Sequence, residues 1–157
     1  MVGPQYASVK QQLGPLLNGF VSFESYVPEP TTDFPGIKEF LARYKPKAIS
    51  TGVDALGYYL PPFSYAGMQI LAAAIEATKG LDQRKIGEYI RRNTHHTIVG
   101  DVQFGSDGEW LHSRVLQVQY QNITGSDLAQ FEKPGTQIIL FPSAYKSGQL
   151  LYPLPQP

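Results

Sequence analysis

The chain has 157 residues, with 13 basic and 13 acidic side chains, a formal net charge of zero and no cysteine. A neutral chain without a basic run lacks the electrostatic footprint of a nucleic-acid-binding protein, and without cysteine it has no disulfide, thiol nucleophile or cysteine-based zinc site. No stretch approaches the roughly 20 apolar residues that a membrane-spanning helix needs, and the first residues lack the basic start and apolar run of a signal peptide.

The first residues predict the end of a strand at Met1-Val2 and a tight turn at Gly3-Pro4. Nothing precedes this strand, so we expect either a very short strand or a chain cut from a longer protein. Residues 7–13 favour a short helix, because Gly14-Pro15 directly afterwards terminates it.

Residues 19–26 alternate apolar and small polar side chains, a pattern typical of a strand. The proline-rich stretch over residues 27–32 predicts a crossing from one structural unit to another. Asp33 is expected to cap the next helix and Pro46 to end it. The apolar stripe of this helix consists of Ile37, Phe40, Leu41 and Tyr44. Residues 45–57 lack a period and favour a loop.

The strongest predicted helix begins near Pro61-Pro62. Its broad apolar face comprises Phe63, Ala66, Gly67, Ile70, Leu71, Ala74 and Ile75. The opposite face is also poor in charge, and a helix that is apolar nearly all round is expected to be buried. Lys79-Gly80 is expected to end this helix. Asp82 is expected to cap a further helix that buries Ile86, Tyr89 and Ile90.

In the last third of the chain the apolar period changes to two, which predicts strands. Residues 106–108 favour a turn. A long strand is expected over residues 110–120, a polar loop over 123–135 and a last strand over 138–141, before an extended proline-rich tail.

Together these elements predict an α/β fold. A long buried helix needs a sheet to cover it, and the strands next to this helix in the sequence are too few. The pattern therefore indicates part of a larger α/β protein.

Candidate catalytic and metal-binding groups are few. Adjacent residues point in different directions, so His95-His96 favours local bonding at a helix end over shared metal ligation. Asp101, Glu109 and His112 are the only plausible acid–base set for a small enzyme. The sequence has neither a nucleophile elbow nor a phosphate-binding glycine loop of the usual form.

Two segments have the character of a binding surface. The turn over residues 3–6 precedes a helix, where free backbone amides suit a carboxylate or another polar ligand group. The alternative is a plain loop-to-helix turn. Residues 57–63 concentrate aromatic side chains and prolines, which could wall a ligand pocket with rigid apolar surface. The alternative is core packing under a loop.

Eight short segments follow one another in a characteristic order: Met1-Val2-Gly3-Pro4-Gln5, residues 13–19, residues 40–44, residues 65–71, residues 97–104, Asp107-Gly108, Val118-Gln119-Tyr120 and residues 152–155. In this order and spacing they resemble the carboxyl-terminal part of type I periplasmic solute-binding proteins of the branched-chain-amino-acid kind, which feed ABC transporters. The resemblance runs over nearly the whole chain.

The resemblance implies two α/β lobes joined by three crossovers, with a ligand held in the cleft between them. Residues 1–29 would end the second lobe, residues 30–112 would belong to the first, and residues 113–157 would form the hinge crossover and the last strands. The implied fold is incomplete on its own. Its partners would be the missing amino-terminal segment or a swapped copy, and the membrane subunits of an ABC transporter. A signal peptide upstream would direct the protein to the periplasm.

The resemblance also implies ligand-binding positions. In the family's amino-acid binders a glutamate follows the Gly-Pro turn and meets the ligand ammonium, whereas this chain has Gln5 there, followed by Tyr6. The family's aromatic wall corresponds to Pro62 or Phe63, with Tyr59 nearby. A neutral amide offers no full counter-charge to an ammonium, which favours an amine-free carboxylate such as an aromatic acid. No cofactor and no metal are implied.

The implied function is capture of a small organic ligand, an amino acid or an aromatic or carboxylic acid. The ligand favours the closed state of the two lobes, and no bond is made or broken. Two alternatives remain: a small α/β enzyme that uses His112, Asp101 and Glu109, and a ligand-sensing domain of a receptor.

Overall fold

The computed structural model describes residues 3–112 and 114–153. Its α-helices are α1 (Ala7–Leu13), α2 (Ile37–Thr51), α3 (Pro61–Thr78) and α4 (Gln83–Arg92). Its strands are β1 (Val21–Glu24), β2 (His95–Thr97), β3 (Gly100–Val102), β4 (Leu116–Tyr120) and β5 (Gln137–Phe141). Short 3-10 helices are η1 (Gly3–Gln5), η2 (Gly14–Leu17), η3 (Pro30–Thr32), η4 (Leu128–Glu132) and η5 (Ser143–Tyr145).

The described residues form two compact units. Unit 1 comprises residues 3–33, 42–59 and 114–153, and unit 2 comprises residues 34–41 and 60–112. Helix α2 therefore has residues in both units.

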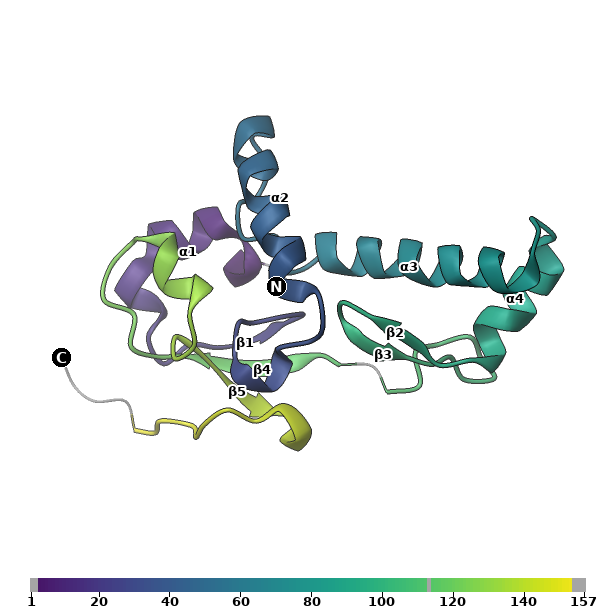
Figure 1. The fold of residues 1–157 in the computed structure, drawn as a ribbon. Helices are drawn as coiled ribbons and strands as arrows, with labels where there is room; N and C mark the ends of the chain where they lie inside the picture. Colours follow the sequence, from purple (N-terminus) through teal and green to yellow (C-terminus); the bar gives the residue numbers. More distant parts are fainter. Residues whose placement is uncertain (1–2, 113, 154–157) are drawn as a thin grey trace. The chain divides into compact units, whose positions relative to one another are not determined.

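Unit 1 is built on a three-stranded antiparallel sheet in the order β1-β4-β5 (Figure 1). Glu24 of β1 pairs with Leu116 of β4, and Tyr120 of β4 pairs with Gln137 of β5. Because residues directly opposite in an antiparallel pair share a face, one face of the sheet carries alternate residues of all three strands. The buried members of this face are Glu24, Leu116, Val118, Tyr120, Gln137 and Ile139.

Helix α1 and the 3-10 helix η4 pack against each other in unit 1. Lys10 of α1 contacts the ring of Tyr120 and the carboxylate of Glu24 on the buried face of the sheet. Phe131 of η4 packs against the same ring, and both Lys10 and Phe131 are fully buried. The core of unit 1 therefore combines apolar side chains with buried polar ones.

Unit 2 consists of α3, α4 and the antiparallel hairpin of β2 and β3, with His95 of β2 paired with Val102 of β3 (Figure 1). Helix α3 packs against α4 and β2. The predicted cap of α4 is confirmed, because the Asp82 carboxylate accepts hydrogen bonds from the backbone amides of Arg84 and Lys85 at 3.0 and 3.1 Å.

Several other predicted elements are confirmed. Helix α1 covers the predicted residues 7–13 and ends at Gly14. Helix α3 begins at Pro61 as expected, and β5 contains the predicted last strand. The predicted strand end at Met1-Val2 and the end of the tail, residues 154–157, lie outside the described residues.

Helix α2 differs from the prediction at both ends. It begins at Ile37, and Asp33 instead follows the 3-10 helix η3. It also continues through Pro46 to Thr51, so the predicted stop at Pro46 is wrong, as is the first half of the predicted loop over residues 45–57.

The reason for the longer α2 lies in contacts that a local pattern does not contain. Pro46 has no N–H for the carbonyl of Ala42, which weakens the helix at this point. The residues on either side are held by other parts of unit 1. The Tyr44 hydroxyl donates to the carbonyl of Asp54 at 2.8 Å, and Ala48 is buried. Tertiary contacts therefore outweigh the local helix breaker.

The predicted strand over residues 110–120 is also too long. Strand β4 covers only Leu116–Tyr120, and Trp110 forms an isolated bridge with Phe104 in unit 2. The chain leaves one unit and enters the other between these two pairings, so a single continuous strand does not form.

Helix α3 is not buried all round. It buries one line of residues at a spacing of four: Pro62, Ala66, Ile70 and Ala74. Tyr65 and Met68 are 46% and 62% exposed, and Leu71 is exposed as well. The described chain therefore leaves much of the apolar surface of α3 uncovered. Over residues 3–112 and 114–153, no helix has the length and apolarity needed to cross a membrane.

Candidate functional site

The turn that precedes α1 is held by hydrogen bonds at several of its polar backbone groups. The carbonyl oxygen of Pro4 lies 3.0 Å from the Tyr120 hydroxyl, and the Lys10 ammonium lies 3.5 Å from the carbonyl oxygen of Gln5. The buried side chain of Gln5 donates to the carbonyl of Phe23 at 3.3 Å. This turn therefore fixes Gln5 in the interior and presents the ring of Tyr6 at the surface.

Two backbone amides at this turn, which were predicted to be free for a ligand, are occupied within the chain. The amide of Tyr6 donates to the carbonyl of Gly3 at 3.2 Å, and the amide of Ala7 donates to the Asp54 carboxylate at 2.7 Å. The carboxylate expected from a ligand at this point is therefore supplied to Ala7 by the chain itself.

Asp54 connects the turn to the loop after α2. Its other carboxylate oxygen accepts hydrogen bonds from the amides of Leu56 and Gly57, both at 3.0 Å. Such an aspartate-stabilised turn fixes a loop in one conformation. The Asp54 brace, as we call these three hydrogen bonds, was not predicted, because its sequence context only indicated a loop.

Tyrosine rings gather around Asp54. The rings of Tyr6 and Tyr59 meet edge to face with centroids 5.2 Å apart. Tyr6 is 40% exposed and Tyr59 is half-buried, so both rings keep accessible surface. Partial burial raises the pKa of Tyr59, and the nearby charge of Asp54 raises it further. Burial and Asp54 likewise raise the pKa of Tyr44.

The five predicted ligand residues are divided between the units. Gln5, Tyr6 and Tyr59 belong to unit 1. Pro62 and Phe63 belong to unit 2, where Pro62 is buried in α3 and Phe63 lies 6.4 Å from Trp110, ring centroid to ring centroid. The structure brings Tyr6 and Tyr59 into direct contact. Their role as ligand residues stays a prediction.

A buried ion pair lies beneath the turn. Lys10 Nζ and Glu24 Oε1 are 3.0 Å apart, and neither side chain is exposed. The Tyr120 hydroxyl is 2.5 Å from the same carboxylate oxygen. Burial raises the pKa of Glu24 and outweighs the opposing effects of the Lys10 charge and of these two hydrogen bonds.

The acid–base set of the enzyme alternative receives no support from its geometry. The Asp101 carboxylate is paired with the exposed ring of His96 at 2.7 Å, and Glu109 and His112 are both exposed. Among the described residues no hydrogen bond joins Asp101, Glu109 and His112, and no group of three or more histidine or acidic side chains could hold a metal ion.

The two adjacent histidines point in different directions, as predicted. His95 is buried and its ring nitrogen lies 3.0 Å from the carbonyl oxygen of Ile90, whereas His96 faces Asp101. Both residues lie in β2, so the prediction that they close a helix is wrong.

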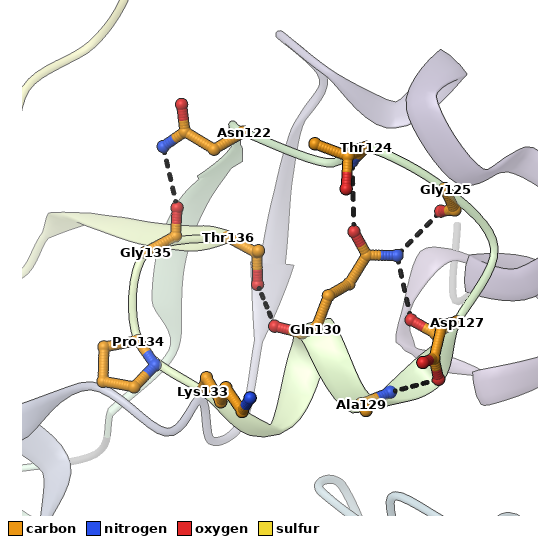
Figure 2. A pocket seen from close by; sticks show the side chains of 10 residues that line it. All are labelled: Asn122, Thr124, Gly125, Asp127, Ala129, Gln130, Lys133, Pro134, Gly135 and Thr136. Atoms are coloured by element: carbon orange, nitrogen blue, oxygen red, sulfur yellow. Dashed lines mark hydrogen bonds between the residues drawn. The ribbon is translucent and has the colours of Figure 1, made fainter.

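A concave surface of about 540 Å³ lies in unit 1 in the connection between β4 and β5 (Figure 2). Its lining residues are Asn122, Thr124, Gly125, Asp127, Ala129, Gln130, Lys133, Pro134, Gly135 and Thr136. The Gln130 side chain makes three hydrogen bonds, to the amide of Thr124 and to the carbonyls of Gly125 and Asp127. Most of the polar groups therefore hold the loop itself, and none of the predicted ligand residues lines this surface.

Comparison with known proteins places the fold. No protein-family model matches the sequence, and no curated protein matches it. Among solved structures, the chain is similar to the leucine-binding protein LivK from Thermotoga maritima MSB8. The TM-score is 0.57 and the sequence identity 23%, and the match covers 77% of this chain and 33% of that one.

This similarity confirms the predicted α/β fold. The helices and strands of the chain correspond to about a third of the length of a leucine-binding protein. A likeness at this level of identity concerns the fold and not the function of the chain.

Proposed function

We propose that this chain is part of a solute-binding protein that captures a small organic ligand for an ABC importer. The observation that carries the proposal is the contact between Tyr6 and Tyr59, two partly exposed rings 5.2 Å apart beside the fixed turn of Gln5. Rigid aromatic surface next to a few oriented polar groups is typical of small-molecule sites. The match to a leucine-binding protein supports the same conclusion at the level of the fold.

In the proposal, residues 1–29 end one lobe, residues 30–112 belong to the other, and residues 113–157 form the hinge crossover and the last strands. The proposed ligand residues are Gln5, Tyr6, Tyr59, Pro62 and Phe63. Gln5 and Pro62 are buried, so the partly exposed rings of Tyr6, Tyr59 and Phe63 supply the contact surface. The ligand bridges the two lobes and favours their closed state by its higher affinity for that state. The membrane subunits of the importer then recognise the closed state, on the periplasmic side of the membrane.

Two ligand classes fit this site: amino acids, and amine-free aromatic or carboxylic acids. The neutral side chain of Gln5 favours the second class. The Asp54 carboxylate near Tyr6 and Tyr59 favours a ligand whose end at these rings is neutral or positively charged. A test of the function therefore needs compounds of both classes.

The test uses the protein isolated from its own cells, with any chain that is attached to or associated with it. Leucine, valine, phenylalanine, benzoate and 3-phenylpropionate are added and the melting temperature is measured. A compound at about 100 times its dissociation constant stabilises by about 2.7 kcal/mol, which corresponds to a rise of about 5–10 °C. Tyr6→Ala and Tyr59→Ala should abolish the rise, whereas Tyr152→Ala, at an 87% exposed position, should retain it.

Two results would contradict the proposal. One is that no compound raises the melting temperature of the unaltered protein. The other is that the rise persists undiminished in both Tyr6→Ala and Tyr59→Ala.

We also propose that further polypeptide of the same protein covers the apolar surface of α3. Tyr65, Met68 and Leu71 are exposed on this helix, and contiguous apolar surface on a monomer marks an interaction site. The match covers only a third of the leucine-binding protein, so the remaining two thirds of such a protein could supply this polypeptide. A swapped copy of the chain is the alternative partner.

Size-exclusion chromatography with light scattering and intact-mass analysis tests this second proposal. The expected result is an assembly or a chain heavier than 17.4 kDa. A compact monomer of that mass alone, with Met68 accessible to oxidation, would contradict it.

A further inference from the structure

Lys10 and Glu24 form an ion pair in an aromatic surrounding that excludes water. Both side chains are fully buried. Lys10 Nζ lies 6.0 Å from the ring centroid of Tyr58 and 5.8 Å from those of Tyr120 and Phe131. Cation–π contacts and the carboxylate compensate the ammonium only in part for its lost hydration.

Stability alone does not account for this pair. Replacing a buried ion pair by apolar side chains of similar volume often leaves a protein as stable as before, or more stable. Glu24 Oε2 is also buried and has no hydrogen-bond partner among the described residues. We therefore expect this ion pair to have a role other than stabilising the core.

The remaining hydrogen bonds of Lys10 and of the Tyr120 hydroxyl go to the turn before α1. The Tyr120 hydroxyl is shared between Glu24 Oε1, at 2.5 Å, and the carbonyl oxygen of Pro4, at 3.0 Å. Lys10 Nζ reaches the carbonyl oxygen of Gln5 at 3.5 Å. Glu24 and Tyr120 stand on adjacent paired strands, so their positions are fixed by the sheet. The group thus links the sheet to two consecutive carbonyls of the turn.

We propose that Lys10, Glu24 and Tyr120 are positioning residues, which hold the turn before α1 so that the exposed ring of Tyr6 faces the ligand. This inference rests on the proposed function. It assigns the three residues no contact with the ligand: they act through the backbone of the turn, whose other end is held by Asp54 at the amide of Ala7. Loss of the group should loosen the turn while the sheet stays folded.

The first test is hydrogen exchange in the Tyr120→Phe variant of the intact protein. This change keeps the ring beside Lys10 and removes only the hydroxyl. The amides of Tyr6 and Ala7 should exchange at least about tenfold faster than in the unaltered protein, since their protection depends on the turn. The amides of Val118 and Ile139 should be unaffected.

Tyr58→Phe is the matched control. It also removes a buried hydroxyl near Lys10, but that hydroxyl donates to the carbonyl of Phe131 at 3.2 Å, away from the turn. The inference is overturned if Tyr120→Phe leaves the exchange of Tyr6 and Ala7 unchanged, or if Tyr58→Phe accelerates it to the same extent.

A second variant replaces both charges, Lys10→Met with Glu24→Leu, because a single replacement leaves a buried charge unpaired. Its urea midpoint should be equal to or higher than that of the unaltered protein, whereas the exchange of Tyr6 and Ala7 should again be about tenfold faster. A lowered midpoint with normal exchange at the turn would show that the pair serves stability alone.

Ligand binding separates this inference from the proposed function. Leucine, phenylalanine and benzoate should each bind Tyr120→Phe about tenfold more weakly than the unaltered protein, if they bind the latter, and Tyr58→Phe with unchanged affinity. Faster exchange at the turn without binding of any compound to the unaltered protein would reject the proposed function only. Binding that is unaltered in Tyr120→Phe would reject the positioning role.

Discussion

The Asp54 carboxylate accepts a hydrogen bond from the backbone amide of Ala7 at 2.7 Å, across 47 positions of the chain. This contact ties the loop after α2 to the first residue of α1. Because Tyr59 follows the same loop and Tyr6 precedes the same helix, the contact also brings their two rings together. The geometry of the candidate site thus depends on a carboxylate that belongs to the chain.

Substitutions of Asp54 should separate the two parts of the Asp54 brace. Asp54→Asn keeps one carbonyl oxygen for the amides of Leu56 and Gly57, but it presents an amide group to the amide of Ala7. The lost hydrogen bond to Ala7 should lower the free energy of unfolding by about 1 kcal/mol. Asp54→Ala removes all three hydrogen bonds and should cost about 2–3 kcal/mol. Urea unfolding measures both values. Equal losses in the two variants would show that the contact with Ala7 contributes nothing.

Gly57 should tolerate no side chain. Its φ is +61°, and a Cβ built there lies 2.2 Å from Cε1 of Tyr44. Gly57→Ala combines a left-handed backbone with overpacking, and should destabilise unit 1 by about 2–4 kcal/mol.

Gly52→Ala is the matched control for this substitution. Gly52 has a similar φ of +70° but no atom within 4 Å of the built Cβ, so the cost should be limited to about 1–2 kcal/mol of backbone strain. Thermal or urea unfolding of the two variants compares them, and equal losses would argue against the contact with Tyr44.

The buried carboxyl of Glu24 should make stability depend on pH. Burial raises its pKa in the folded protein above the usual value of 4.5, so the folded state binds this proton more tightly than the unfolded chain. The resulting stabilisation is complete below pH 4.5 and is lost as the pH rises through the folded pKa. The slope is at most about 1.4 kcal/mol per pH unit.

Urea unfolding from pH 4 to 8, with Glu24→Gln as the reference, isolates this effect. The difference in free energy of unfolding, unaltered protein minus Glu24→Gln, should fall as the pH rises. A difference that increases with pH would mean that the pKa of Glu24 is lowered on folding.

Alkaline pH should destabilise unit 1 through its buried tyrosines. Burial and, to a smaller extent, the charge of Asp33 raise the pKa of Tyr26 from 10 to about 12. The stabilisation from its bound proton is complete below pH 10 and is lost as the pH rises through about 12. Between pH 10 and 12 the free energy of unfolding of Tyr26→Phe should therefore fall by about 2–3 kcal/mol less than that of the unaltered protein.

Tyr152→Phe, at an exposed position, is the control for Tyr26→Phe and should follow the unaltered protein. The measurement is urea unfolding at several pH values between 9 and 12. Parallel curves for all three proteins would indicate that Tyr26 titrates as it does in the unfolded chain.

Elements with strong local signals were predictable from the sequence. Gly14 ends α1, Asp82 caps α4, and the prolines at the start of α3 mark its first turn. Each signal acts within a few residues of the element that it ends or begins. Lys79-Gly80 ends α3 as predicted, and Lys79 is the residue that adopts the left-handed cap conformation.

Features that depend on distant residues were not predictable. The continuation of α2 through Pro46 rests on the hydrogen bond from the Tyr44 hydroxyl to the carbonyl of Asp54 and on the burial of Ala48. The Asp54 brace and the Lys10–Glu24 pair join residues 47 and 14 positions apart. Composition and periodicity describe one element at a time, so such contacts leave no pattern in the sequence.

Binding of a small organic solute by Tyr6 and Tyr59 is measured most directly by NMR of the intact protein with labelled tyrosine rings. Tyr6→Phe, Tyr59→Phe and Tyr152→Phe assign the three signals, and leucine, phenylalanine and benzoate are then titrated in turn. We expect one of these compounds to shift the signals of Tyr6 and Tyr59 together, to saturation, and to leave the signal of Tyr152 unchanged. Signals of Tyr6 and Tyr59 that stay unmoved at millimolar concentrations of all three compounds would contradict it.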